Sequence, residues 1–296
     1  MHFLDYDKQG LDAQYNLREV VPTYQEYFDQ WDKRSQDARA SYPCDLNIPY
    51  GSVPLECLDI FPSGRKNSPV MVFIHGGYWQ GSDKSQFSYL AQGFIPTGIT
   101  FIAVNYSLAP KVGMDEIVHQ NRRALTWVWQ HAEEFGYNSD RIFVSGHSAG
   151  GHLVSLLAST DWPNFAPGLP PDLIKGICSI SGIFDLEPVR CCYLNAVLEM
   201  DEEVSKRNSP IIHLPELEIP LILSVGGLET EEFQRQSEEY AARWRSKRLP
   251  LEVVAMPGFH HYSIVDELAN PAGPLNRAVV SQISRVSSDP KKLLKM

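Results

Sequence analysis

The stretch RIFVSGHSAG, residues 141–150, decides the fold of this chain. Its first half is β-branched and aromatic, which favours a strand, and a helical pattern, HLVSLLA at 152–158, follows it. A strand, a G-x-S-x-G turn and a helix in this order form a nucleophile elbow, which exposes a serine hydroxyl. Because such a turn is crowded, a side chain at Gly146 or Gly150 would collide with neighbouring backbone. The stretch therefore predicts Ser148 as a nucleophile.

A second glycine turn lies upstream of the elbow. The motif HGGYW at 75–79 follows the apolar run VMVFI at 70–74, as an oxyanion loop follows a strand in an α/β-hydrolase. Acyl transfer passes through a tetrahedral oxyanion, and backbone N–H groups must already face it. We assign this role to the N–H groups of Gly77, Tyr78 and Ala149. The two motifs together predict an α/β-hydrolase fold.

The acid of a catalytic triad should follow a late strand, because the chain order in this fold is serine, acid, histidine. LILSV at 221–225 is such a strand, and GGLETEE at 226–232 follows it. Glu229 lies in this loop, at the carboxyl end of the strand, where catalytic groups of open α/β sheets lie. We favour Glu229 as the acid, and Glu231 and Asp185 are the alternatives.

The base should follow the last strand, LEVVAM at 251–256. The next loop, PGFHHY at 257–262, contains two adjacent histidines, and both are candidates. We favour His261 over His260 because an aromatic residue follows it, as in related hydrolases. Such a base is needed because a serine hydroxyl is a weak nucleophile until its proton is removed.

The remaining histidines have structural interpretations. His75 and His147 flank the two glycine turns, and we expect them to form hydrogen bonds that hold the loop shape. His152 lies in the helix after Ser148 and is expected to pack there. No His/Cys/Asp cluster has zinc-site spacing, and neither nucleotide-binding glycine motif is present. We therefore expect no metal and no cofactor.

Apolar strands alternate with helical patterns from about residue 57 onward. This order predicts one domain over residues 1–296, with a mostly parallel central sheet and helices on both faces. Two segments fall outside the pattern: residues 1–50, with helices around 13–40, and residues 182–220, with an amphipathic helix at 191–200. We expect both to form a small lid over the active site. The alternative for residues 1–50 is packing on the back of the domain.

Composition limits the partners and the compartment. A net charge of −10 and a pI near 5.4 argue against binding to nucleic acid or an anionic membrane. No apolar run is long enough to span a membrane, and residues 1–8 are too polar for a secretory signal. Five cysteines without a disulfide framework indicate a reducing compartment. We expect a cytoplasmic protein with a small-molecule substrate, and a homodimer as the one candidate assembly.

Six motifs are spread over most of the chain: LNIPYG at 46–51, HGGYWQ at 75–80, GHSAGGHL at 146–153, SGIFDLEP at 181–188, RNSP at 207–210 and EFQRQS at 232–237. In these motifs the chain resembles the kynurenine formamidase (arylformamidase) family, which is related to the hormone-sensitive-lipase-like esterases. The esterases usually have a third glycine where this chain has Tyr78.

The resemblance implies a Ser148–Glu229–His261 triad, although many family members have aspartate where Glu229 stands. It also implies hydrolysis of N-formyl-L-kynurenine to kynurenine and formate, in tryptophan catabolism. Tyr78 and Trp79 beside the oxyanion loop are candidates to stack on the aromatic ring of this substrate, and packing under the loop is the alternative for Trp79.

Two other functions use the same fold. A carboxylesterase for small short-chain acyl esters would need the same catalytic groups, and only the shape of the pocket would separate it from a formamidase. A non-catalytic binding protein is the third reading, but such proteins usually lose one of the catalytic groups that this chain retains.

Overall fold

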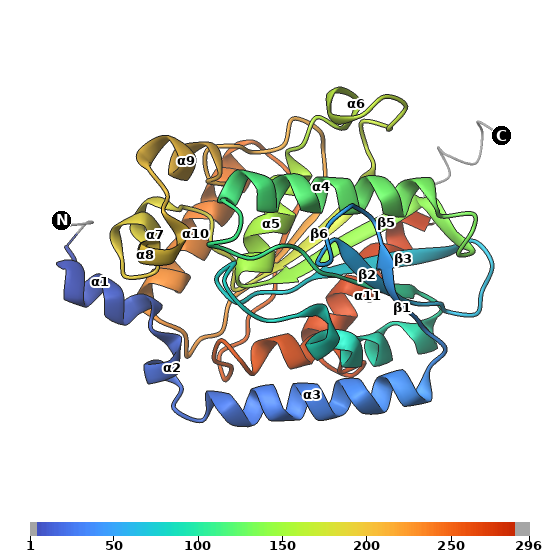
Figure 1. The fold of residues 1–296 in the computed structure, drawn as a ribbon, viewed down its shortest axis with the longest axis horizontal. Coiled ribbons are helices and arrows are strands. Elements are labelled where there is room, and N and C mark those ends of the chain that lie inside the picture. Colours follow the sequence, from blue (N-terminus) through green and yellow to red (C-terminus); the bar gives the residue numbers. More distant parts are fainter. Residues whose placement is uncertain (1–4, 288–296) are drawn as a thin grey trace.

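The computed structural model describes residues 5–287, and an eight-stranded sheet runs through its centre (Figure 1). The apolar runs seen in the sequence form its inner strands, which are buried along their whole length because helices cover both faces. In chain order the strands are β1 (Asp45–Pro49), β2 (Cys57–Phe61), β3 (Ser68–Ile74), β4 (Thr100–Val104), β5 (Tyr137–His147), β6 (Ile174–Ile180), β7 (Leu221–Ser224) and β8 (Leu251–Val253).

The strand order across the sheet is β1-β2-β4-β3-β5-β6-β7-β8. All neighbours from β4 to β8 are parallel, whereas β2 is antiparallel to both β1 and β4. Ile74 at the end of β3 pairs with Gly146 of β5, so the two glycine turns leave the sheet side by side. The predicted α/β-hydrolase architecture with a mostly parallel sheet is confirmed.

Helices α4 and α5 cover one face of the sheet, and η1 and α11 cover the other (Figure 1). Helix α4 buries the apolar side that its sequence period predicts, including Ile117 and Leu125. These and the remaining helices after β2 are η1 (Lys84–Gly93), η2 (Ile95–Thr97), α4 (Met114–Gln130), α5 (Ala149–Ala158), α6 (Trp162–Phe165), α7 (Glu187–Cys191), α8 (Asn195–Leu198), α9 (Glu202–Arg207), α10 (Glu231–Ser246), η3 (Ile264–Leu268) and α11 (Pro274–Ser287).

The N-terminal segment begins with three helices: α1 (Lys8–Tyr15), α2 (Leu17–Val20) and α3 (Tyr24–Ser41). Helix α3 packs outside η1, where the buried Trp31 lies 5.4 Å from the ring of Phe87. Residues 45–49 instead form β1, so the expectation that all of residues 1–50 lies outside the core pattern is wrong there. The side chains of β1 are mostly exposed, and its pairing with β2 is through the backbone. Residues 1–4 of this segment lie outside the described part.

The segment 182–220 contains three short helices rather than the single amphipathic helix predicted at 191–200. Helix α7 ends at Cys191 because Cys192 adopts extended backbone, and α8 ends at Leu198 because Glu199 lies in the left-handed region. In Figure 1, α1, α7, α8 and α9 gather at the same end of the molecule.

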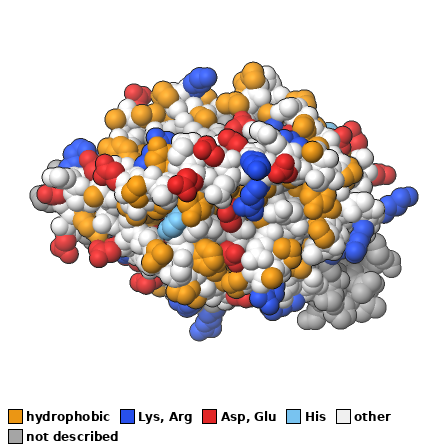
Figure 2. Space-filling model, turned by 90° about the horizontal axis from the view of Figure 1, so that it is seen from below, with side chains coloured by type: hydrophobic (Ala, Val, Ile, Leu, Met, Phe, Trp, Pro, Cys, Tyr) orange, Lys and Arg blue, Asp and Glu red, His pale blue; other side chains and the backbone are white. Residues whose placement is uncertain are grey.

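Acidic and basic side chains are interspersed on the face drawn in Figure 2, rather than separated into fields of one sign. Within residues 5–287, no helix has the length and apolar character that crossing a membrane requires.

Candidate active site

The elbow at Ser148 is as crowded as the sequence predicts. A Cβ added at Gly146 would overlap the carbonyl of Gly150, and one added at Gly150 would overlap the carbonyl oxygen of Ile74. Ser148 itself has φ 58° and ψ −120°, which is a strained conformation for a residue with a side chain. The steric prediction for both glycines is confirmed.

The HGGYW loop lies directly against the elbow. A Cβ added at Gly76 would come within 2.9 Å of the Cβ of Ser148. Among residues 5–287, no group accepts a hydrogen bond from the backbone N–H of Gly77, Tyr78 or Ala149. Ala149 is the first residue of α5, so its N–H has no partner within the helix. All three donors are therefore available to an oxyanion beside Ser148.

His75 forms hydrogen bonds that stabilise the shape of the oxyanion loop, as expected. Its ring nitrogens lie 2.9 Å from the carbonyl oxygen of Gly76 and 2.9 Å from Oδ1 of Asn105. The ring stacks on Tyr106 at 4.4 Å, and the Tyr106 hydroxyl donates to the His75 carbonyl. Burial lowers the pKa of His75, which favours the neutral ring.

Glu229 and His261 form a buried pair. Nδ1 of His261 lies 2.6 Å from Oε2 of Glu229, and neither side chain exposes more than 4% of its surface. The other carboxylate oxygen accepts from the Ser181 hydroxyl at 2.5 Å and from the Gly226 N–H at 2.7 Å. A carboxylate held at three points can orient the imidazole and stabilise its protonated form.

The alternatives for these two positions have other partners. Nε2 of His260 lies 3.0 Å from the hydroxyl of Tyr27 on α3. Glu231 accepts from a tyrosine of the N-terminal segment, and Asp185 accepts from the backbone N–H two residues further along the chain. The structure brings none of these three alternatives to the Ser148 cavity.

Ser148 and His261 line one cavity of about 430 Å³, a volume typical of small-molecule sites. Both segments outside the central pattern contribute to its wall. The N-terminal segment contributes Asn16, Leu17, Arg18, Phe28 and Trp31, and the segment 182–220 contributes Tyr193 and Leu194. Residues 16–31 therefore do not lie on the back of the domain, which was the alternative placement for the N-terminal segment.

The structure contradicts the assignment of Trp79 to substrate binding. Its side chain is fully buried and does not line the cavity, because it packs against the ring of His152 at 4.9 Å. Tyr78 does line the cavity, and its hydroxyl donates to the carbonyl of Tyr15. His152 packs as expected, and its Nε2 donates to the Asn208 carbonyl at 2.7 Å.

Comparison with known proteins identifies the family of this chain. It is 33% identical to a kynurenine formamidase of Danio rerio over 258 residues, which cover 85% of this chain and 86% of the relative. The chain belongs to the kynurenine formamidase family. A kynurenine formamidase of Salmo salar is 34% identical over 233 residues, covering 76% and 77% of the two chains.

Two other comparisons also match most of the chain. The family model described as BD-FAE matches residues 58–241. A crystal structure of a candidate thioesterase from Silicibacter sp. TM1040 has a TM-score of 0.81 and 28% identity, covering 91% of this formamidase-family chain and 98% of the other.

Sequence reasoning did not identify the role of Ser181 in the site of this chain. Ser181 follows β6 and donates to Glu229, and its position after a strand end was the available signal. His147 forms a hydrogen bond to a loop, as expected, and this loop is the one that carries the proposed base, because Nε2 of His147 donates to the carbonyl of His261 at 2.8 Å. Among residues 5–287, no group of three or more His, Cys, Asp or Glu side chains could hold a metal ion.

Proposed function

We propose that this protein is a serine hydrolase that cleaves N-formyl-L-kynurenine to kynurenine and formate. The observation that carries the proposal is the buried Glu229–His261 pair, whose histidine lines the same cavity as Ser148 and the oxyanion loop. Membership of the kynurenine formamidase family supports the choice of substrate. No metal or organic cofactor takes part in the proposed reaction.

In the first half of the reaction, Oγ of Ser148 attacks the formyl carbon while Nε2 of His261 takes its proton. The N–H groups of Gly77, Tyr78 and Ala149 stabilise the oxyanion that forms. The intermediate collapses when the C–N bond breaks and His261 gives its proton to the aromatic amine. Kynurenine leaves, and the formyl group stays on Ser148 as an ester.

In the second half, a water molecule gives one proton to His261 and attacks the formyl ester. The second tetrahedral intermediate expels Oγ of Ser148, which recovers its proton from His261, and formate leaves. Glu229 keeps Nδ1 of His261 protonated and oriented through both halves.

We also propose a single domain with a lid. The helices of residues 8–41 and the segment 182–220 would form this lid, because both supply residues to the cavity wall. We infer a cytoplasmic location, which the free state of all five cysteines supports. A homodimer is the largest assembly that we propose, and sedimentation analysis would test it.

A comparison of kcat/KM on N-formylkynurenine and on short-chain nitrophenyl esters tests the function. A formamidase should hydrolyse N-formylkynurenine far faster than aliphatic formamides, and formyl and acetyl esters faster than butyryl esters. A preference for longer esters with no turnover of N-formylkynurenine would instead make the protein a carboxylesterase with the same triad.

A further inference from the structure

The active-site cavity contains a single fixed charge. Among the described residues that line it, Arg18 is the only lysine or arginine, and no aspartate or glutamate is present. Glu229 is buried behind His261 and does not reach the cavity surface. An isolated cation in a ligand cavity of a protein with net charge −10 calls for an anionic group on the ligand.

Arg18 is an exposed residue of α2 whose guanidinium lies over an aromatic ring and has no ionic partner among residues 5–287. It lies 5.1 Å from the centre of the Tyr24 ring, a cation–π distance. No carboxylate in the part of the chain between residues 5 and 287 forms an ion pair with it. Asp12 on the preceding helix is already engaged, because it accepts from Lys8 and from the Tyr193 N–H, both at 2.7 Å. The forked donors of Arg18 are therefore free to bind an anion.

An aromatic wall connects Arg18 to the catalytic histidine. The ring of Tyr262 lies 5.7 Å from the ring of His261 and 6.2 Å from the ring of Tyr24. Tyr24 is the residue whose ring the Arg18 guanidinium contacts. Phe28 and Trp31 pack against Tyr262 at 5.9 Å and 6.3 Å and line the same cavity. A flat aromatic group would bury its faces against such a wall.

We propose that Arg18 binds the carboxylate of an aromatic amino-acid substrate, while the wall of Phe28, Trp31 and Tyr262 packs on its ring. The inference rests on the proposed function, because N-formylkynurenine has an aryl ring and an α-carboxylate on the leaving-group side. A guanidinium fork binds a carboxylate through two parallel hydrogen bonds and so orients the substrate as well as attracting it. Arg18 thereby selects amino-acid formanilides over formanilides without a carboxylate.

The test compares two formanilides, N-formylkynurenine and N-formyl-2-aminoacetophenone, the second of which lacks the α-amino-acid end with its carboxylate and its ammonium group. In R18Q, kcat/KM for N-formylkynurenine should fall at least about tenfold more than for the neutral substrate, mainly through KM. R18K keeps the charge without the fork and should lie between R18Q and the wild type. R277Q, which removes an exposed arginine of α11 outside the cavity, is the matched control.

Salt provides a second readout. Added NaCl should raise KM of the wild type for N-formylkynurenine because it screens the ion pair, and it should have little effect on KM of R18Q. Equal losses on the charged and the neutral substrate in R18Q, or the same salt dependence in both proteins, would overturn the inference.

Failure of the proposed function gives a different result. In that case the wild type ignores both formanilides but hydrolyses aryl esters. The role of Arg18 is then tested by comparing kcat/KM for 4-acetoxybenzoate with kcat/KM for its neutral analogue 4-acetoxybenzamide. A preference for the carboxylate that disappears in R18Q supports the site, and an unchanged preference refutes it.

Discussion

Ser148 combines a strained backbone with a position beside three N–H donors that have no partner in the described part of the chain, residues 5–287. The strain persists because Gly146 and Gly150 allow the backbone segments around it to approach so closely. We expect S148A to lower kcat by at least about 10³-fold, since triad members act as a unit. The urea midpoint should stay near that of the wild type, because the change removes one hydroxyl. A sulfonyl fluoride should label Ser148 in the wild type and no residue in S148A.

Substitutions at neighbouring residues distinguish the proposed triad from the alternative assignments. We expect H261A and E229Q to lower kcat by about 10²–10⁴-fold, because the base or its orienting group is lost. H260A and E231Q are the matched controls and should keep most of the activity, since those side chains bind tyrosines of the N-terminal segment. An inactive H260A with an active H261A would reverse the assignment.

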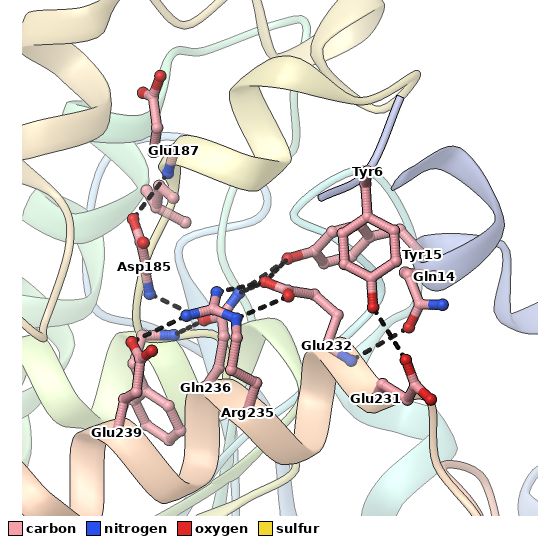
Figure 3. Close-up of polar contacts among 12 residues, drawn as sticks. Tyr6, Gln14, Tyr15, Asp185, Glu187, Glu231, Glu232, Arg235, Gln236 and Glu239 are labelled. Atoms are coloured by element: carbon pink, nitrogen blue, oxygen red, sulfur yellow. Dashed lines mark hydrogen bonds and ion pairs between the residues drawn. The ribbon is translucent and has the colours of Figure 1, made fainter. Parts of the chain in front are cut away.

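At the scale of elements, helix α1 contacts both α10 and the oxyanion loop. Figure 3 shows the first of these contacts, where Tyr15 of α1 lies against Glu232 and Gln236 of α10. The Tyr15 hydroxyl donates to the buried carboxylate of Glu232 at 3.1 Å and accepts from Gln236 at 2.8 Å. The carbonyl of the same residue accepts from the Tyr78 hydroxyl at 2.9 Å. The N-terminal segment is thus packed into the site, and its removal would disturb a residue that carries an oxyanion donor.

Two tyrosines of this segment form a matched pair for a stability measurement. Y15F should lower the free energy of unfolding by about 1.5–3 kcal/mol, because a buried carboxylate loses a hydrogen bond. Y6F removes a similar bond to the exposed Glu231 and should cost less than about 0.5 kcal/mol. Urea unfolding of both variants checks the difference. Equal costs would mean that the buried bond does not stabilise the fold.

At the scale of the whole molecule, three buried histidines couple stability to pH. Burial lowers the pKa of His75 and His147, and it lowers the pKa of His152 to about 4. The unfolded chain binds protons at these residues below about pH 6.5, whereas folded His152 does so only near pH 4. Acid therefore favours the unfolded state.

We expect the unfolding free energy to be fully retained above pH 6.5 and to decrease as the pH falls toward 4. His152 alone should account for about 3 kcal/mol of this loss. Urea unfolding at a series of pH values measures the slope. H152Q should flatten it and H213Q, which changes an exposed histidine, should not. A slope that is the same in H152Q and the wild type would contradict the explanation.

The sequence by itself determined the elements that depend on near neighbours along the chain. The elbow, the oxyanion loop and the inner strands follow from apolar runs and from the spacing of glycines along the chain. Parallel strands whose carboxyl ends meet at one edge then bring loops 75–79, 146–150 and 226–232 together. The fold class and the region of the site were therefore predictable without coordinates.

Only the tertiary structure decided which side chains of those loops face the cavity. His260 and His261 are adjacent in sequence, and their partners, Tyr27 and Glu229, come from different distant segments. Trp79 was predicted to contact substrate, but a helix beneath it provides a buried packing site. Arg18 has no sequence signal, because its role depends on a cavity that five separate stretches of chain enclose. Local pattern fixes backbone direction, whereas side-chain environment depends on contacts between segments far apart in the chain.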